Sequence, residues 1–188
     1  MKPIVLGFLT QLHPQDDEYM KIENLVKTGS TTPNTIFIKK VQKVIKSPIP
    51  NFENQYPAYE LKFHGTTNRS RLKILKKGFE LGKPDHNMFG AGIYCADDPN
   101  KGSQYTKGSN KLIVVKVYLG NKKEVIQSNK KLSKEYLKKQ GFDSVYSPGG
   151  NKGRGGCRLS EYVVYDVTQI TPGYVVEFFR QPPSPQNT

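Results

Sequence analysis

The chain has 188 residues and carries 29 Lys and Arg against 16 Asp and Glu, a formal net charge of +13. This length favours a single domain that buries a core, and the charge favours an acidic partner: nucleic acid, a dinucleotide or an acidic protein. Only two cysteines, Cys95 and Cys157, argue against a disulfide framework, and three histidines without a paired CxxC leave little for a zinc site.

The N-terminal half is predicted to alternate between helices and strands. Residues 13–29 favour a helix, because apolar residues recur at helical spacing and a glycine ends the segment. Residues 35–45 are rich in β-branched side chains and predict a strand. A loop over 46–57 is expected to lead into a short strand at 59–63 and a helix at 68–78.

The C-terminal half is predicted to consist mainly of short strands. The extended segments are 88–96, 111–120, 142–146, 160–167 and 173–179. Short helices are expected in 97–106, where an aspartate suits the cap, and at 132–140. The glycine-rich segment 147–156 is expected to be a flexible loop, and 180–188 a disordered tail.

Many short strands with few short helices favour an α+β domain with mainly antiparallel sheets over a doubly wound parallel sheet. No GxGxxG segment follows a strand to open a helix, and "GGNKGRGG" does not have the P-loop spacing. We therefore expect one domain over residues 1–180, followed by a tail at 181–188.

Three separated segments carry candidate functional residues. His64 lies in "FHGT", at a strand-to-helix turn where backbone N–H and C=O groups are exposed. Tyr94 lies in "MFGAGIYCA", and Glu161 begins "EYVVYDV". Each signal is weak alone, since a lone histidine is usually structural and an acid at a strand end is usually solvated. Their occurrence together and in this order is far more specific.

These segments resemble the catalytic domain of the poly(ADP-ribose) polymerase family, within the diphtheria-toxin-like ADP-ribosyltransferases. The resemblance covers roughly residues 19–180, and "MFGAGIY" is most similar to the tankyrases. His64, Tyr94 and Glu161 match the histidine, tyrosine and glutamate that this family carries on three separated strands. The resemblance implies the ADP-ribosyltransferase fold, two packed and mainly antiparallel sheets with short flanking helices. It also implies NAD as a substrate and no metal.

The resemblance also implies how NAD is held. His64 would bind a hydroxyl of the adenosine ribose, with Thr66 close by, and the backbone of Gly65 would bind the nicotinamide carboxamide. Tyr105 would stack on the nicotinamide ring, and Tyr94 would form the opposite wall.

Glu161 would carry the chemistry. Cleavage of the nicotinamide–ribose bond leaves an oxocarbenium-like sugar, and a fixed carboxylate stabilises a charge that develops in the transition state. The same carboxylate would hold the 2′-hydroxyl of that ribose and orient or deprotonate an acceptor hydroxyl.

The chain departs from the family pattern in the nicotinamide pocket. The family usually has a serine where an ungapped alignment on Tyr105 places Gly102. Either Ser103 replaces that serine after a shift of one residue, or one hydrogen bond to NAD is missing. The segment 80–88, which corresponds to the donor loop, gives no clear adenine contact.

The loop of residues 147–159 is short, glycine-rich and basic, unlike the long acceptor loop of the polymerising members. It is either a simple connector or an acceptor-binding loop in which Lys152, Arg154 and Arg158 meet an acidic target. A mobile loop is a poor preorganised site for the end of a growing polymer, so we expect single or short ADP-ribose additions.

We therefore expect an NAD-dependent ADP-ribosyltransferase that modifies an acidic protein or nucleic acid. The alternatives are an RNA 2′-phosphotransferase-like enzyme, which relies on arginines where this chain has Tyr94 and Glu161, and a non-catalytic binding module for NAD, ADP-ribose or nucleic acid. We expect an intracellular monomer with no signal peptide and no membrane contact. We also expect neither an autoinhibitory helical domain nor DNA-sensing fingers.

Overall fold

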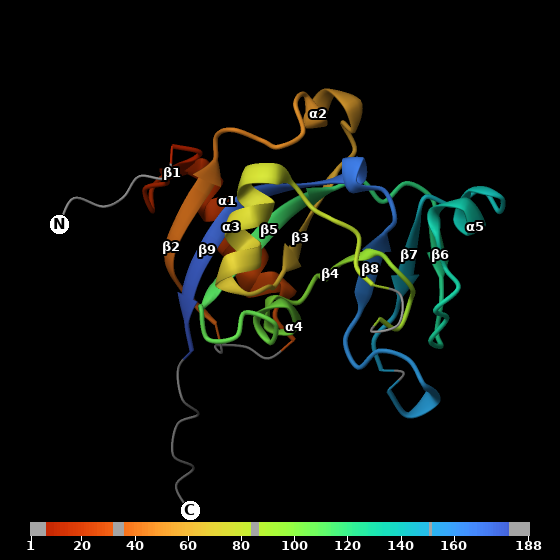
Figure 1. The fold of residues 1–188 in the computed structure, drawn as a ribbon. Helices are drawn as coiled ribbons and strands as arrows, with labels where there is room; N and C mark the ends of the chain where they lie inside the picture. The colour runs from red at the N-terminus through yellow and green to blue at the C-terminus, as the bar shows by residue number, and fades with distance from the viewer. Residues whose placement is uncertain (1–6, 32–35, 84–86, 151, 181–188) are drawn as a thin grey trace, which may run out of the picture.

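The structure, a computed structural model, describes residues 7–31, 36–83, 87–150 and 152–180. Two β-sheets form the body of the molecule, and helices cover both faces of the larger one (Figure 1). The larger sheet has the order β1-β2-β9-β5-β3, with β1 (Leu9–Gln11), β2 (Phe37–Val44), β9 (Ile170–Phe179), β5 (Lys111–Val117) and β3 (Glu60–His64). The smaller sheet has the order β4-β8-β7-β6, with β4 (Ile93–Cys95), β8 (Glu161–Val164), β7 (Ser144–Ser147) and β6 (Lys122–Glu124).

Every strand pair in the described part of the chain is antiparallel except β6 with β7. This confirms the expected α+β class with two mainly antiparallel sheets.

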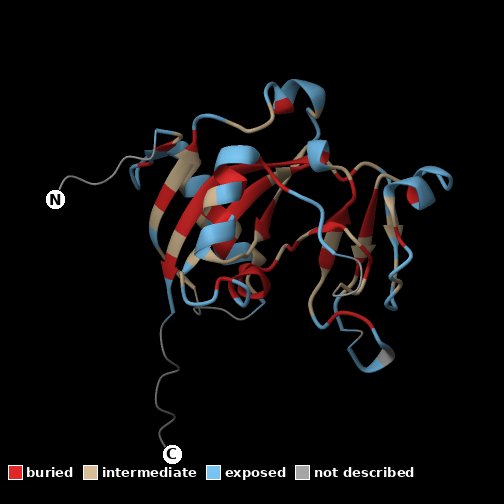
Figure 2. Cartoon of the chain, viewed as in Figure 1, coloured by how far each residue is buried: buried red, intermediate tan, exposed pale blue. Residues whose placement is uncertain are grey.

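Two helices cover opposite faces of the larger sheet. Ile22 and Val26 of α1 (Asp17–Gly29) are buried, and Ile22 packs with alternate residues of β5 and β9. On the other face, Leu75 of α3 (Asn68–Lys77) packs with the intervening β9 residue Val175. Because both faces are covered, the central strands are buried throughout and read as nearly continuous apolar runs (Figure 2).

The remaining helices are short. They are α2 (Phe52–Gln55), α4 (Pro99–Ser103), α5 (Lys134–Lys138) and the 3₁₀ turns η2 (Lys152–Arg154) and η3 (Val167–Gln169). All five residues of α4 are buried, and the helix lies under the junction of the two sheets (Figures 1 and 2). The side chain of Asp98 caps α4 by accepting a hydrogen bond from the Asn100 N–H at 2.7 Å, as expected for this segment.

Some elements differ from the sequence prediction. The segment 46–57, expected to be a loop, contains α2, because Phe52 is buried against the rings of Tyr56 and Tyr59. Strands β1 and β6 were not expected. Helix α5 is shorter than the predicted 132–140, because the Ser133 side chain caps it by accepting from the Tyr136 N–H. The tail expected at 181–188 lies outside the described residues.

A buried lysine joins the two sheets. A backbone bridge links Phe63 to Ala96, and beside it Lys62 Nζ lies 2.6 Å from Asp97 Oδ1 and 2.8 Å from Glu60 Oε2. The hydroxyl of Tyr162 on β8 donates to the other Asp97 oxygen at 2.9 Å. Burial opposes the charge of Lys62, but the hydrogen bonds to the two carboxylates outweigh it and raise the pKa of the lysine. The network therefore ties β3 to β8, the strand on which Glu161 lies.

Replacing Lys62 by methionine is expected to lower the free energy of unfolding by about 3 kcal/mol, because it leaves two carboxylates beside a buried site without their cation. Denaturant unfolding followed by circular dichroism measures this. The matched control is Lys27→Met, since Lys27 forms an exposed ion pair with Glu23 on α1, and its loss is expected to change stability by less than about 1 kcal/mol. Equal effects of the two substitutions would show that the Lys62 network does not hold the sheets together.

Candidate active site

A cleft of about 550 Å³ opens where β3, α3, β4 and α4 meet the start of β8. Its volume is within the range of small-molecule and cofactor sites. The predicted residues that line it are His64, Gly65, Thr66, Tyr94, Tyr105 and Glu161. The structure thus brings together residues that are separated by almost 100 positions in the sequence.

His64 is the last residue of β3, and its neighbours fix its ring. Nδ1 lies 2.8 Å from the backbone oxygen of Tyr94, and a carbonyl only accepts, so Nδ1 carries the proton and Nε2 remains an acceptor. The Phe79 ring packs edge-on against the imidazole, with centroids 5.1 Å apart. Burial lowers the pKa of His64 and outweighs the opposite effect of the bond to Tyr94. The ring is therefore neutral at physiological pH and suited to accept a hydrogen bond from a ligand hydroxyl.

Tyr94, in the centre of β4, forms part of the cleft wall and holds the glycine-rich turn before the strand. Its hydroxyl accepts from the Phe89 N–H and donates to the Gly90 oxygen, both at 3.0 Å. Gly90 has a φ of +75°, and a Cβ there would lie 2.3 Å from the Leu132 oxygen, so the turn requires glycine. Because the turn takes the only proton of the Tyr94 hydroxyl, this hydroxyl cannot also donate to a ligand, and the ring is the part of the side chain that can pack against one.

Gly65 packs directly on α4. A Cβ on Gly65 would lie only 1.6 Å from the backbone oxygen of Gly102. The turn after β3 and the helix α4 therefore approach each other with no room for a side chain at position 65. Gly65 and Tyr105, which follows α4, both line the cleft.

Ser103 is a predicted binding residue that does not line the cleft. Its hydroxyl donates to the Asn100 oxygen at 2.8 Å and accepts from the Arg180 guanidinium. Gly102 lines the cleft instead, and a Cβ there would lie 3.0 Å from a Leu112 methyl group. The sequence left two alternatives: Ser103 replaces the serine that the family usually has in the nicotinamide pocket, or that hydrogen bond is missing. The arrangement favours the second.

Glu161 begins β8, and its carboxylate is held from both sides. Lys101 Nζ lies 3.0 Å from Oε1 and also donates to the Leu159 oxygen at 2.9 Å. The Cys157 thiol donates to Oε2 at 3.1 Å. Both side chains of the ion pair are only 11% exposed, so the carboxylate is positioned at the edge of the cleft with little freedom. Sequence reasoning identified neither Lys101 nor Cys157 as functional.

Tyr105 completes the site on the side of α4. It is 54% exposed, although its pKa is raised by partial burial and by the nearby Glu161 charge. A large aromatic ring that lines a cleft and is half open to solvent offers a stacking surface for a planar ligand.

Among the described residues, no group of three or more His, Cys, Asp and Glu side chains is placed to hold a metal ion. Over the same residues, no helix has the length and apolar character needed to span a membrane.

Comparison with known proteins identifies the family. The sequence model of the poly(ADP-ribose) polymerase catalytic domain matches residues 16–179. Poly [ADP-ribose] polymerase 2 of Zea mays is 26% identical over 204 residues, which cover 89% of this chain and 31% of the relative. The tankyrase of Caenorhabditis elegans is 25% identical over 169 residues (70% of this chain, 7% of the relative), and poly [ADP-ribose] polymerase 1 of Gallus gallus is 26% identical over 199 residues (87% and 20%).

The chain therefore spans less than a third of the length of these relatives. Their identities to it are nearly equal, so the likeness of "MFGAGIY" to the tankyrases stays a prediction. Because the family model covers well over half of the sequence, the chain belongs to the poly(ADP-ribose) polymerase catalytic domain family.

Proposed function

We propose that the protein is an NAD-dependent ADP-ribosyltransferase that cleaves the nicotinamide–ribose bond and transfers ADP-ribose to an acceptor. The observation that carries this proposal is the fixed carboxylate of Glu161 in the same cleft as His64, Gly65, Tyr94 and Tyr105. The comparisons support it, since all three relatives are named poly(ADP-ribose) polymerases.

In this proposal the residues of the cleft hold the two halves of NAD. His64 Nε2 accepts a hydrogen bond from a hydroxyl of the adenosine ribose, because its other nitrogen is occupied by the Tyr94 carbonyl. The nicotinamide lies between the rings of Tyr105 and Tyr94, and the backbone of Gly65 pairs with its carboxamide. A backbone pair suits an amide, because donor meets acceptor at both positions.

Glu161 acts on the ribose next to the nicotinamide. Its carboxylate binds the 2′-hydroxyl and stabilises the positive charge that grows on the sugar as nicotinamide leaves. Lys101 holds Oε1 and thereby keeps the carboxylate oriented before the substrate binds. An acceptor hydroxyl then attacks the sugar carbon as its proton is released towards the carboxylate.

Substituting His64 by alanine is expected to weaken NAD binding about tenfold, since one hydrogen bond to the ribose is lost. Tyr105→Ala is expected to weaken it by a similar factor through loss of stacking. Calorimetric titration with a non-hydrolysable NAD analogue measures both effects. The control is His13→Ala, because His13 is exposed and lies outside the cleft. Unchanged affinity in both cleft variants would place the NAD site elsewhere.

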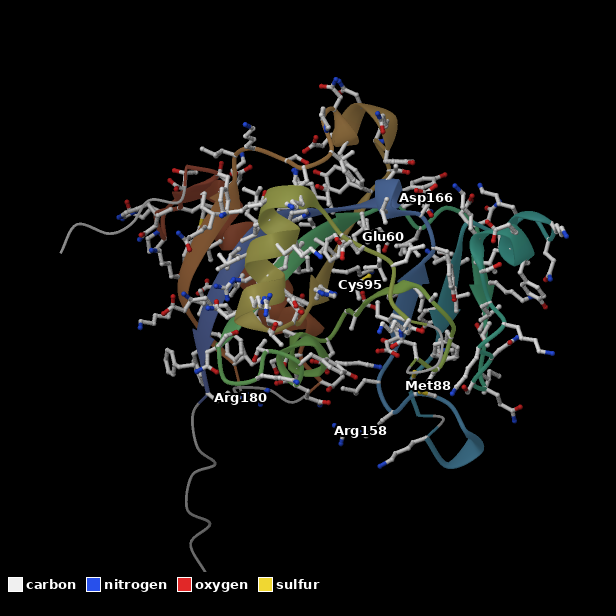
Figure 3. All side chains as sticks on the ribbon, viewed as in Figure 1. Glu60, Met88, Cys95, Arg158, Asp166 and Arg180 are labelled. Carbon is white, nitrogen blue, oxygen red and sulfur yellow. The ribbon has the colours of Figure 1, made fainter. Side chains whose placement is uncertain are left out.

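The acceptor is proposed to be acidic, and the product to be a single ADP-ribose or a short chain. Lys152 and Arg158 are exposed in the loop before β8, and Arg158 projects at the lower edge of the molecule (Figure 3). The side chain of Arg154, the third basic residue expected to bind an acceptor, is outside the described part of the structure. The loop is positively charged, but it also contains several exposed glycines, which make its backbone flexible. A flexible backbone is a poor preorganised surface for binding the end of a growing polymer.

Incubation with labelled NAD, with and without added protein and nucleic acid, tests this proposal. We expect nicotinamide release and label on the acceptor, in bands of one or a few units on a high-percentage gel. A long ladder would refute the short-chain product, and absence of nicotinamide release with every acceptor would favour a non-catalytic NAD-binding module instead.

A further inference from the structure

The Cys157 thiol touches the carboxylate of Glu161 from inside the protein. Its sulfur lies 3.1 Å from Oε2, but Cys157 is only 3% exposed and does not line the cleft. It belongs instead to an apolar cluster with residues such as Val145 and Val163. Glu161 therefore lies at the boundary between the cleft and the apolar core. Lys101 contacts one carboxylate oxygen, and the Cys157 thiol contacts the other from the core side.

The thiol is in the protonation state needed to donate. Burial raises the pKa of Cys157, and the negative charge of Glu161 raises it further. The charged and titratable groups around the pair are Lys101 from α4, Tyr94 from β4 and Tyr105 after α4, and Lys101 only partly opposes the rise. At neutral pH the sulfur thus carries its proton and can satisfy a carboxylate oxygen that faces apolar surroundings.

A second buried polar group lies near the thiol. Ser147 lies directly opposite Glu161 in the β7–β8 pair and is completely buried. Its hydroxyl has no hydrogen-bond partner among the described residues, and it opposes only part of the rise in the pKa of Cys157. The thiol is therefore the group on this side of the carboxylate that donates to Glu161.

We propose that Cys157 is a positioning residue: its thiol fixes Oε2 of Glu161, so that the carboxylate keeps one orientation for the 2′-hydroxyl and the developing charge. This inference rests on the proposed ADP-ribosyltransferase activity. Lys101 alone restrains only Oε1, which leaves the carboxylate free to rotate about its terminal torsion, and such a misplacement lowers the rate of the chemical step more than substrate binding.

Two substitutions at position 157 separate positioning from packing. Cys157→Ser keeps a hydrogen-bond donor but is more polar, whereas Cys157→Val keeps an apolar side chain of similar size but has no donor. We expect Cys157→Val to lower kcat for nicotinamide release roughly tenfold, because one hydrogen bond to a charged group is lost. The KM for NAD is expected to change by less than about twofold. We expect Cys157→Ser to keep kcat within about threefold of the wild-type value. The packing control is Val145→Ala, which opens the same apolar cluster without removing a donor.

The pH profile provides a readout that packing alone does not change. Without the thiol, the charged form of the carboxylate loses a stabilising hydrogen bond, so the acidic limb of kcat/KM is expected to move to higher pH in Cys157→Val but not in Cys157→Ser or Val145→Ala. A Val variant with the wild-type kcat and profile would overturn the proposal, as would a Ser variant as impaired as Val.

The inference can be tested even if the proposed activity fails. The chemical shift of the Glu161 carboxyl carbon, measured by NMR at neutral pH in uniformly labelled protein, is expected to change in Cys157→Val and to stay close to the wild-type value in Cys157→Ser. Absence of nicotinamide release in the wild type would refute the proposed function alone. An identical chemical shift of the Glu161 carboxyl carbon in all three proteins would refute the role of Cys157 alone.

Discussion

Replacing Glu161 by glutamine is expected to lower nicotinamide release at least about 100-fold while NAD binding is retained. Glutamine keeps the shape and hydrogen-bonding ability of the side chain but removes its negative charge. In the proposed reaction that charge stabilises the transition state more than the bound substrate, so we expect the loss to appear in kcat rather than in KM. Release of labelled nicotinamide and titration with an NAD analogue measure the two quantities separately.

The same substitution removes the partner of Lys101, whose ammonium group is largely buried. A fall in activity therefore has to be compared with thermal unfolding of the variant. The matched control is Glu135→Gln on α5, because Glu135 is exposed and remote from the cleft. Turnover of Glu161→Gln close to that of the wild type, in folded protein, would refute the assignment of Glu161 as the catalytic carboxylate.

The candidate site residues that lie on strands could be predicted, because the sequence around each of them indicates its local structure. "FHGT" ends a strand and precedes a helical pattern, and the structure places His64 as the last residue of β3. The same holds for Tyr94 inside β4 and Glu161 at the start of β8. The apolar run of β5 was evident for a related reason, because helices and the second sheet cover both of its faces.

The residues that hold Glu161 were not predictable, because their partners are distant or ordinary in the sequence. Lys101 meets Glu161 only after α4 has folded against the loop before β8, and nothing in the sequence distinguishes it from the many other lysines. The one feature of the sequence that points to Lys101 is its position directly before Gly102 in "NKGSQYT". Cys157 is a small buried side chain, which usually indicates packing alone.

Ser103 is the opposite case, a predicted binding residue that the structure places outside the lining of the cleft. A serine next to the expected position was a reasonable candidate, but the sequence does not show which way a hydroxyl on a single helical turn points. In the structure this hydroxyl is buried and hydrogen-bonded to the backbone of α4 and to Arg180.

The short strands β1 and β6 could not be predicted either. Each has three residues, and pairing with β2 and β7, rather than composition, makes them strands.

Gly65→Ala is expected to have the second large effect, in this case on both NAD binding and stability. The added methyl group would lie 1.6 Å from the Gly102 oxygen, and both neighbours are backbone, so no side chain can rotate away. Either the turn after β3 or helix α4 has to move. We expect destabilisation of about 3 kcal/mol, at the upper end for overpacking, and at least a tenfold loss of NAD affinity.

The two effects have a common origin, because α4 carries Lys101 and Gly102 and leads into Tyr105, while the turn carries Gly65 and follows His64. Separation of these segments moves the backbone of Gly65, which we propose binds the carboxamide, away from the ring of Tyr105, which we propose stacks on the nicotinamide. Denaturant unfolding and calorimetric titration with the NAD analogue measure the two losses. Gly7→Ala is the control, because a Cβ at Gly7 would meet nothing within 4 Å. An alanine variant at position 65 with normal stability and normal NAD affinity would show that the close contact between the turn and α4 is not needed to build the site.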